Sequence, residues 1–226
     1  MTSRTVPYPL AKRVTDKGLA GLLLVLLAPI FAVAAAAVGM GQLFSPRDRG
    51  PWLYRERRVS RGREFDLLKF RTLRCAALES QRDGEAHARL LENEAENLTW
   101  AGRRILKPGC VSRLRYRRGD GYLDELPQLF NVLRGDMSLV GPRPWPPSMV
   151  HGQVAAGLDY RNHVMSGWTG PVQVQKGIVE PAGYAKLDLA YVDACRSWSS
   201  LRLLRSDFRI LWRTVGVLAR GEGLTY

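Results

Sequence analysis

Cysteine and histidine are scarce in this chain, and neither is arranged as a set of ligands. The three cysteines, Cys75, Cys110 and Cys195, are far apart, and no two of them form a CxxC pair. This spacing indicates neither a disulfide framework nor a zinc site, and it favours a reducing, cytoplasm-facing location. The three histidines are equally scattered, so we interpret each as a packed or solvated side chain.

The sequence also lacks the motifs of several common enzyme classes. It contains no GxxxxGK[ST] phosphate loop, no GxGxxG dinucleotide fingerprint and no HExxH metalloprotease helix. Each of these chemistries needs its glycines or ligands at a fixed spacing, so those classes are excluded. We find no internal repeat and no low-complexity linker.

Negative charge is in the minority. Lys and Arg together number 34 against 21 for Asp and Glu, which gives a formal net charge of +13. A charge of this size predicts attraction to anionic partners, whether nucleic acid, an acidic membrane surface or phosphorylated substrates. The length of 226 residues allows one or two domains with a real core.

Charge is missing altogether between Gly18 and Phe44. This run exceeds the roughly 20 residues that a helix needs to cross a bilayer. One interpretation is a signal peptide, because a basic segment precedes the run and residues 32–34 read Ala-Val-Ala. A second is a spanning helix, but basic residues flank both ends of the run, and the positive-inside rule would assign both flanks to the cytoplasm.

A third interpretation is a re-entrant segment that enters and leaves the membrane on one face. Pro29 lacks an N–H group and clashes with the carbonyl of Val25, so it predicts a bend near the middle of the run. The residues alone leave all three interpretations open.

Two further segments have a pattern that can be interpreted in two ways. In EFDLLKFRTL, Lys69 and Arg71 alternate with Phe70, so both cations could share one face of an extended segment, or simply protect an edge strand. Near the C-terminus, residues 201–215 place apolar and basic side chains on different sides of a helix. Such a helix either lies in a membrane interface or packs on the core with a solvated basic face.

The segment LDELPQLFNVLRGDMSLVGPRP sets Asp124 and Glu125 side by side. Apolar residues recur at helical intervals after them, which predicts a helix with Asp124 to Pro127 in its first turn. Asp124 would then be an N-cap and Glu125 a partner of the helix dipole. The same geometry favours a phosphate, and a carboxylate there could act as a nucleophile or ligate Mg²⁺. Arg143, fixed between two prolines, suits bidentate phosphate recognition.

This segment closely resembles the signature of the bacterial monotopic phosphoglycosyl transferases, also called bacterial sugar transferases or undecaprenyl-phosphate sugar-phosphotransferases. The resemblance extends over nearly the whole chain. It includes the following motifs, in the family's order: LAPI at 27–30, KFRTL at 69–73, GWTGPVQVQ at 167–175, KLDLAYVD and VLARGEG.

The resemblance implies a reaction. A UDP-sugar donor would give its sugar 1-phosphate to polyprenyl (undecaprenyl) phosphate, with release of UMP, as the initiating step of cell-surface glycan synthesis. Asp124 matches the family's nucleophile, which forms a covalent phosphosugar intermediate, and Glu125 matches the second member of the pair. Mg²⁺ is the implied cofactor, with Asp124 as a ligand. The implied phosphate-binding cations are Arg143, Lys69, Arg71 and, on a weaker match, Lys176.

The resemblance also implies a fold and a location. We expect a mostly α fold with a small β component (α+β), in a monotopic membrane protein on the cytoplasmic face of the bacterial inner membrane. Residues 1–17 would be a basic flank, 18–44 a re-entrant helix-break-helix bent at Pro29, and 45–226 a catalytic domain with a C-terminal basic amphipathic helix. Membrane lipids and, by analogy alone, a second copy of the chain are expected partners; nucleic acid is not.

Departures from the family pattern leave the sugar open. Ala28 replaces a usual serine before the proline, and Met165 and Pro171 stand in the loop implicated in sugar-nucleotide recognition. Two alternatives from other classes are a catalytically inactive membrane scaffold of the same fold and a basic nucleic-acid-binding protein. The second leaves the uncharged run unexplained.

Overall fold

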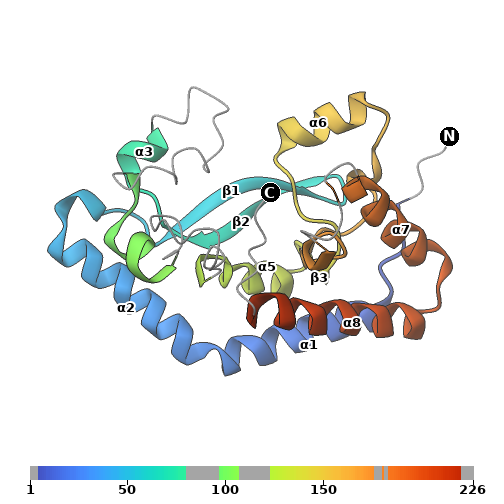
Figure 1. Ribbon diagram of the computed structural model, residues 1–226, viewed down its shortest axis with the longest axis horizontal. Helices are drawn as coiled ribbons and strands as arrows, with labels where there is room; N and C mark the ends of the chain where they lie inside the picture. The colour runs from blue at the N-terminus through green and yellow to red at the C-terminus, as the bar shows by residue number, and fades with distance from the viewer. Residues whose placement is uncertain (1–4, 80–96, 107–122, 176–179, 181–182, 220–226) are drawn as a thin grey trace. The chain divides into compact units, whose positions relative to one another are not determined.

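The computed structural model describes residues 5–79, 97–106, 123–175, 180 and 183–219. Its helices, in chain order, are α1 (Leu10–Leu26), α2 (Ala28–Phe44), α3 (Cys75–Glu79), α5 (Gln128–Arg134), α6 (Pro147–Ala155), α7 (Tyr184–Ser197) and α8 (Ser200–Ala219). The strands are β1 (Leu53–Ser60), β2 (Arg63–Phe70), β3 (Ser138–Val140) and β4 (Gly167–Thr169). The predicted α+β class, mostly helical with small sheets, is confirmed (Figure 1).

The described residues fall into two compact units. The first comprises those within 1–24, 56–67 and 128–219, and the second those within 25–55 and 68–127. Because α1, β1 and β2 each begin in one unit and end in the other, the units alternate along the chain. The division into 1–17, 18–44 and 45–226 stays a prediction.

The uncharged run forms two helices with a break at Leu27. Pro29 lies in the first turn of α2, where a missing N–H costs no intrahelical hydrogen bond. Within the described residues no single helix has the length and hydropathy to cross a membrane, whereas α1 and α2 pass that test as a pair bent by 63°.

The described residues form two sheets, each of two strands. β1 and β2 form a long hairpin joined at Arg61 and Gly62 (Figure 1). β3 and β4 are parallel, with Ser138 opposite Gly167 and Val140 opposite Thr169. A side chain at Gly167 would come within 2.0 Å of the backbone nitrogen of Gly141, so this close approach requires glycine.

The first unit is built around a buried polar network as well as an apolar core. The largest side chains in that core include Leu129, Met137, Leu139, Val192 and Leu203. Lys12 Nζ of α1 is 2.5 Å from Asp207 Oδ2 of α8. Tyr191 donates its hydroxyl to the other Asp207 oxygen at 2.8 Å. Burial raises the pKa of the Asp207 carboxyl, and the Lys12 ammonium opposes that rise.

α8 exposes much of its apolar surface. Leu201, Phe208, Trp212 and Val215 are between 49% and 79% exposed, whereas Leu203, Ile210 and Val217 face the core. The core-facing side of the helix also includes the buried polar residues Asp207 and Thr214. Of the two interpretations of this helix, the exposed apolar stripe favours a membrane interface.

Candidate active site

A small pocket in the second unit contains three of the residues that the sequence predicted for the site. It is lined by Tyr54, Lys69, Phe70, Arg71, Thr72, Leu73, Leu78 and Asp124. Its volume of about 20 Å³ is close to that of one water molecule. Asp124, Lys69 and Arg71 therefore line a common pocket, which is too small to enclose a whole substrate.

Asp124 lies on a 3₁₀ turn, Leu123–Glu125, and is 1% exposed. The predicted position in the first turn of the following helix is wrong, because α5 begins only at Gln128. Pro127 has no N–H and disfavours helical geometry at Leu126, which separates the turn from the helix. The N-cap and helix-dipole arguments for the carboxylate pair therefore do not hold.

The turn that carries Asp124 is fixed by the core of the second unit. Leu123 packs against a cluster made of Ala34, Ala37, Val38, Phe70, Ala101 and Leu106. Phe70 belongs to this cluster, so the same core anchors the chain on either side of the pocket. Within it, the ring centroids of Phe31 and Phe70 are 5.8 Å apart. Asp124 is thus carried on a turn whose position is fixed by apolar packing.

Thr72 forms part of the pocket wall and is held from behind. Its carbonyl accepts hydrogen bonds from the Thr99 backbone N–H at 2.8 Å and the Thr99 hydroxyl at 3.2 Å. A side chain at Gly102 would come within 2.5 Å of the same carbonyl oxygen. Glycine is therefore needed where the π-helical turn Gly102–Leu106 approaches the wall.

Arg71 is only 1% exposed, and its guanidinium is engaged with backbone carbonyls. Its nitrogens donate to the carbonyls of Pro51 at 2.7 Å, Leu73 at 3.1 Å and Asp48. β2 ends at Phe70, so the strand alternation that suggested one shared face for Lys69 and Arg71 stops before Arg71. These contacts give Arg71 a structural task in the pocket wall. Lys69, half-buried in the same lining, is the better placed of the two for a phosphate.

Sequence reasoning missed Asp48, which completes this wall. Its carboxylate is buried and accepts from Arg74 Nε at 2.9 Å and from the Trp100 backbone N–H at 2.6 Å. Asp48 thereby ties residues 48–51 to the segment that follows β2. Its position in the basic stretch SPRDRG was the only signal, and burial could not be seen from it.

The remaining predicted residues lie elsewhere. Glu125 follows Asp124 in the same turn and is partly buried. Arg143 belongs to the first unit. Lys176 lies outside the described residues. The roles given to these residues stay predictions.

The loop that carries Arg143 is held by a second arginine. Arg161 donates to the Arg143 carbonyl, pairs with Asp188 at 2.8 Å, and lies 4.0 Å from the centroid of the Trp145 ring. Burial raises the pKa of the Asp188 carboxyl, and the Arg161 guanidinium opposes that rise. Asp188 lies in the KLDLAYVD motif, which could have pointed to it, although the motif alone assigned it no task.

The donor chemistry of the pocket fits Mg²⁺. In the part of the chain that the structure describes, no group of three or more His, Cys, Asp or Glu side chains could hold a metal ion. Mg²⁺ does not need such a cage, because it usually takes one or two carboxylates, with waters and substrate phosphates as its other ligands. Asp124 has a carboxylate of this kind in the pocket lining, and its sequence neighbour Glu125 carries a second.

Comparison with known proteins identifies the family. Residues 7–221 match the model of the bacterial sugar transferases. The UDP-glucose:undecaprenyl-phosphate glucose-1-phosphate transferase of Caulobacter vibrioides is 36% identical over 216 residues, which cover 93% of this chain and 70% of that protein. The undecaprenyl-phosphate galactose phosphotransferase of Salmonella typhimurium is 36% identical over 78% of this chain and 35% of its own length.

A third relative, the UDP-glucose:undecaprenyl-phosphate glucose-1-phosphate transferase of Xanthomonas campestris, is 33% identical over 97% of this chain and 40% of its own length. The chain thus spans well under half the length of two of these three relatives. The matches agree on sugar-phosphate transfer and differ in the sugar. They confirm the predicted class of enzyme, and the chain belongs to the bacterial sugar transferase family.

Proposed function

We propose that this protein transfers a sugar 1-phosphate from a UDP-sugar to polyprenyl phosphate through a covalent intermediate on Asp124. The observation that carries the proposal is the buried Asp124 carboxylate in a pocket with Lys69, in a chain of the bacterial sugar transferase family. The relatives' names support polyprenyl phosphate as the acceptor.

The reaction needs two displacements at one phosphorus atom. An Asp124 carboxylate oxygen attacks the phosphorus that bears the sugar, the bond to the oxygen bridging to UMP breaks, and UMP leaves with that electron pair. A phosphate oxygen of the polyprenyl carrier then attacks the same phosphorus, and the Asp124 carboxylate is released. The product is a polyprenyl-diphosphate sugar, and no oxidant or reductant is needed. Splitting the transfer in this way replaces one difficult step by two easier ones.

Other residues of the chain hold the charges in place. Lys69 offers an ammonium to the donor phosphates, while Arg71 and Asp48 keep the pocket wall rigid. Glu125, the sequence neighbour of the nucleophile, would accept a proton from the acceptor phosphate or orient a metal ligand. Bound Mg²⁺ would be held by Asp124, with Glu125 as the second candidate ligand, and would neutralise phosphate charge.

The donor and the sugar are tested with a substrate panel. Purified protein, polyprenyl phosphate and Mg²⁺ are incubated with individual UDP-sugars, and UMP release is measured for each. We expect at least one UDP-sugar to release UMP over many turnovers when the acceptor is present, and no more than about one UMP per protein molecule without it. Absence of UMP release with every sugar would favour the inactive scaffold.

We further propose that α1 and α2 form a re-entrant element on the cytoplasmic face of the inner membrane. The support is their 63° bend and the apolar side chains they expose, among them Leu22, Val25, Val33 and Leu43. Ala28 cannot offer the hydroxyl that a serine would give to the freed backbone groups of the bend. Pro29 cannot donate to the Val25 carbonyl, and α2 starts again with the hydrogen bond from Phe31 N–H to the Leu27 carbonyl at 2.9 Å.

This topology predicts that both flanks of the element face the cytoplasm. Single cysteines are placed at Arg13 and Arg49 in a chain whose native cysteines are replaced by serine. Both should react with a membrane-impermeant maleimide only when the cytoplasmic face of the inner membrane is exposed to the reagent. The expected result follows from the basic residues on both flanks. Labelling of one site from each face would show a spanning helix instead.

Substitution of Lys69 should weaken substrate binding, whereas substitution of Arg71 should lower the stability of the fold. Lys69→Gln removes one charge-assisted phosphate contact, so we expect the KM for the UDP-sugar to rise about tenfold with little change in thermal stability. Arg71→Lys cannot satisfy three carbonyls at once, so we expect a loss of about 2–4 kcal/mol in the free energy of unfolding. Steady-state kinetics and denaturant unfolding of both variants separate these effects. A stable Arg71→Lys protein with a raised KM would reassign Arg71 to substrate binding.

A further inference from the structure

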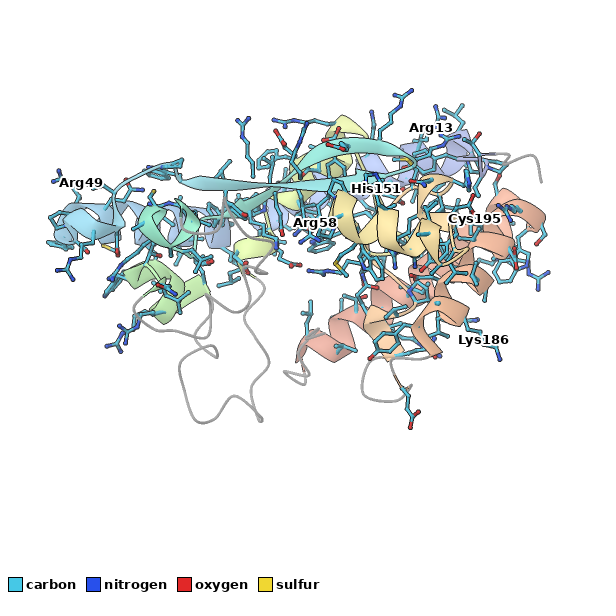
Figure 2. All side chains as sticks on the ribbon, turned by 90° about the horizontal axis from the view of Figure 1, so that it is seen from above. Arg13, Arg49, Arg58, His151, Lys186 and Cys195 are labelled. Carbon is cyan, nitrogen blue, oxygen red and sulfur yellow. The ribbon has the colours of Figure 1, made fainter. Side chains whose placement is uncertain are left out.

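A second cavity, in the first unit, is much larger than the Asp124 pocket. Its volume is about 630 Å³. It lies where the beginning of α1, the turn of the β1–β2 hairpin and the residues after α5 meet. Four cations line it: Arg13, Lys17, Arg61 and Arg63. Arg13 can be located in Figure 2. The reaction at Asp124 gives this cavity no task.

The cavity has an excess of positive charge. Its two acidic residues already have partners, since Glu64 lies 3.6 Å from Arg57 and Asp136 accepts from Asn131 at 2.9 Å. Among the described residues, Lys17, Arg61 and Arg63 take part in no ion pair. Four cations against two carboxylates leave this hollow with a net positive charge, which favours an anion there, and the planar guanidinium suits a phosphate in particular.

The backbone conformation at Arg61 also indicates a functional role for this cation. Arg61 has a φ of 51° and Gly62 a φ of 72°, so the hairpin turns through two left-handed residues. Such a turn favours Asn, Asp or Gly at its first position. An arginine there costs roughly 1–2 kcal/mol of backbone strain, and strain of this kind concentrates at functional sites. The position therefore retains a cation at some cost to stability.

Part of the cavity lining is apolar, and the cavity adjoins the helix α1, which leads into the proposed membrane segment. The rings of Tyr8 and Phe65 and the side chain of Met165 line it. Arg13 and Lys17 precede the uncharged run on α1, and the same helix exposes Leu10 and Val14 at 75% and 63%. A ligand that fits has a phosphate beside an apolar body.

We propose that this cavity binds the phosphate group of an anionic phospholipid headgroup. The proposal rests on the membrane association proposed above. The lipid phosphate would contact Arg61, Arg63 and Lys17 while its acyl chains leave along the exposed apolar face of α1. A bound headgroup would hold α1 at the membrane surface immediately before the run that enters it.

The test uses the full chain in a neutral detergent and two double variants of equal charge. Arg61→Asn with Arg63→Gln removes two cavity cations, and asparagine suits the left-handed backbone of residue 61. Lys186→Gln with Arg196→Gln removes two exposed cations of α7, outside the cavity lining. Binding of dimyristoylphosphatidylglycerol, dimyristoylphosphatidylcholine and inorganic phosphate is measured by native mass spectrometry and by thermal shift.

We expect phosphatidylglycerol to bind the wild type in preference to phosphatidylcholine. Its affinity should fall about ten- to thirtyfold in the cavity variant and less than threefold in the control variant. Equal losses in the two variants would overturn the proposal, because charge alone would then explain binding. Saturation by inorganic phosphate with the same dependence on Arg61 and Arg63, and no preference for the lipid, would replace the phospholipid by a soluble phosphate ligand.

The proposed catalytic function is tested separately in the same preparation. Covalent labelling of the wild type by a UDP-sugar in detergent reports on Asp124 without reference to this cavity. If the protein is labelled, and if its lipid affinity does not change when Arg61 and Arg63 are substituted, the lipid site alone is refuted. Selective lipid binding without labelling would refute the catalytic proposal alone.

Discussion

Asp124→Asn should abolish sugar-phosphate transfer, lowering the rate of UMP release on the order of 10³-fold or more. An amide of the same shape cannot form the acyl phosphate, so both displacements are lost. The substitution changes neither the packing of Leu123 nor the core beneath the turn. The loss should therefore appear without a change in thermal stability.

Two further variants make this result specific. Asp193→Asn removes an exposed carboxylate of α7 whose side chain is 74% exposed, and it should leave UMP release unchanged. Glu125→Gln should still become labelled by a UDP-sugar in the absence of acceptor but should pass the sugar phosphate to polyprenyl phosphate more slowly. Retention of more than about a tenth of the activity in Asp124→Asn would reject Asp124 as the nucleophile.

Lys12→Met should lower the free energy of unfolding by about 3–5 kcal/mol, because it leaves two carboxylates buried without their cation. Lys12 Nζ lies 2.5 Å from Asp207 and 3.6 Å from Asp16, and all three side chains are at most 6% exposed. Hydroxyl groups cannot replace the cation, since Tyr191 and Ser138 already donate to these carboxylates at 2.8 and 2.6 Å. Urea unfolding in neutral detergent measures the loss.

The control for Lys12 is an exposed ion pair in the same unit. Arg57 lies 3.3 Å from Asp66, and its side chain is 64% exposed. Because solvent screens such a pair, Arg57→Met should lower the free energy of unfolding by less than about 1 kcal/mol. Equal losses for the two variants would show that the buried network contributes nothing beyond a surface pair.

The Lys12→Met defect should shrink as the pH falls. Burial raises the pKa of Asp207 above its ordinary 3.8, and Lys12 opposes the rise, so removing Lys12 raises that pKa further. At a pH between the ordinary pKa of Asp207 in the unfolded chain and its raised pKa in the folded variant, the folded protein binds more protons than the unfolded chain. The free energy of unfolding therefore increases with falling pH. Unfolding curves of the variant should show this increase as the pH falls from 7 toward the raised pKa of Asp207. A steady loss of stability over the same range would contradict the assignment.

Local features of this fold could be predicted from the sequence better than its long-range contacts. A single proline predicted the break in the uncharged run, because the missing N–H acts within one helical turn. The helical character of residues 200–219 followed from spacing, but the side that faces the core did not, since it depends on the buried Asp207.

Contacts between distant residues explain the remaining differences. Lys12 and Asp207 are 195 positions apart, and nothing in either neighbourhood predicts that they meet. Asp48 and Arg71 look like ordinary charged residues of a basic segment, yet both are 1% exposed. The predicted helix start at Asp124 was wrong, because the Leu-Pro pair delays the helix to Gln128.

The covalent intermediate is the central claim, and peptide mass mapping tests it most directly. The protein is incubated with an active UDP-sugar and Mg²⁺ in the absence of polyprenyl phosphate, digested with a protease and analysed by tandem mass spectrometry. We predict a sugar-phosphate adduct on the peptide containing Asp124, which disappears when polyprenyl phosphate is added and never forms in Asp124→Asn. An adduct on another residue, or turnover to product without any adduct under single-turnover conditions, would contradict the account.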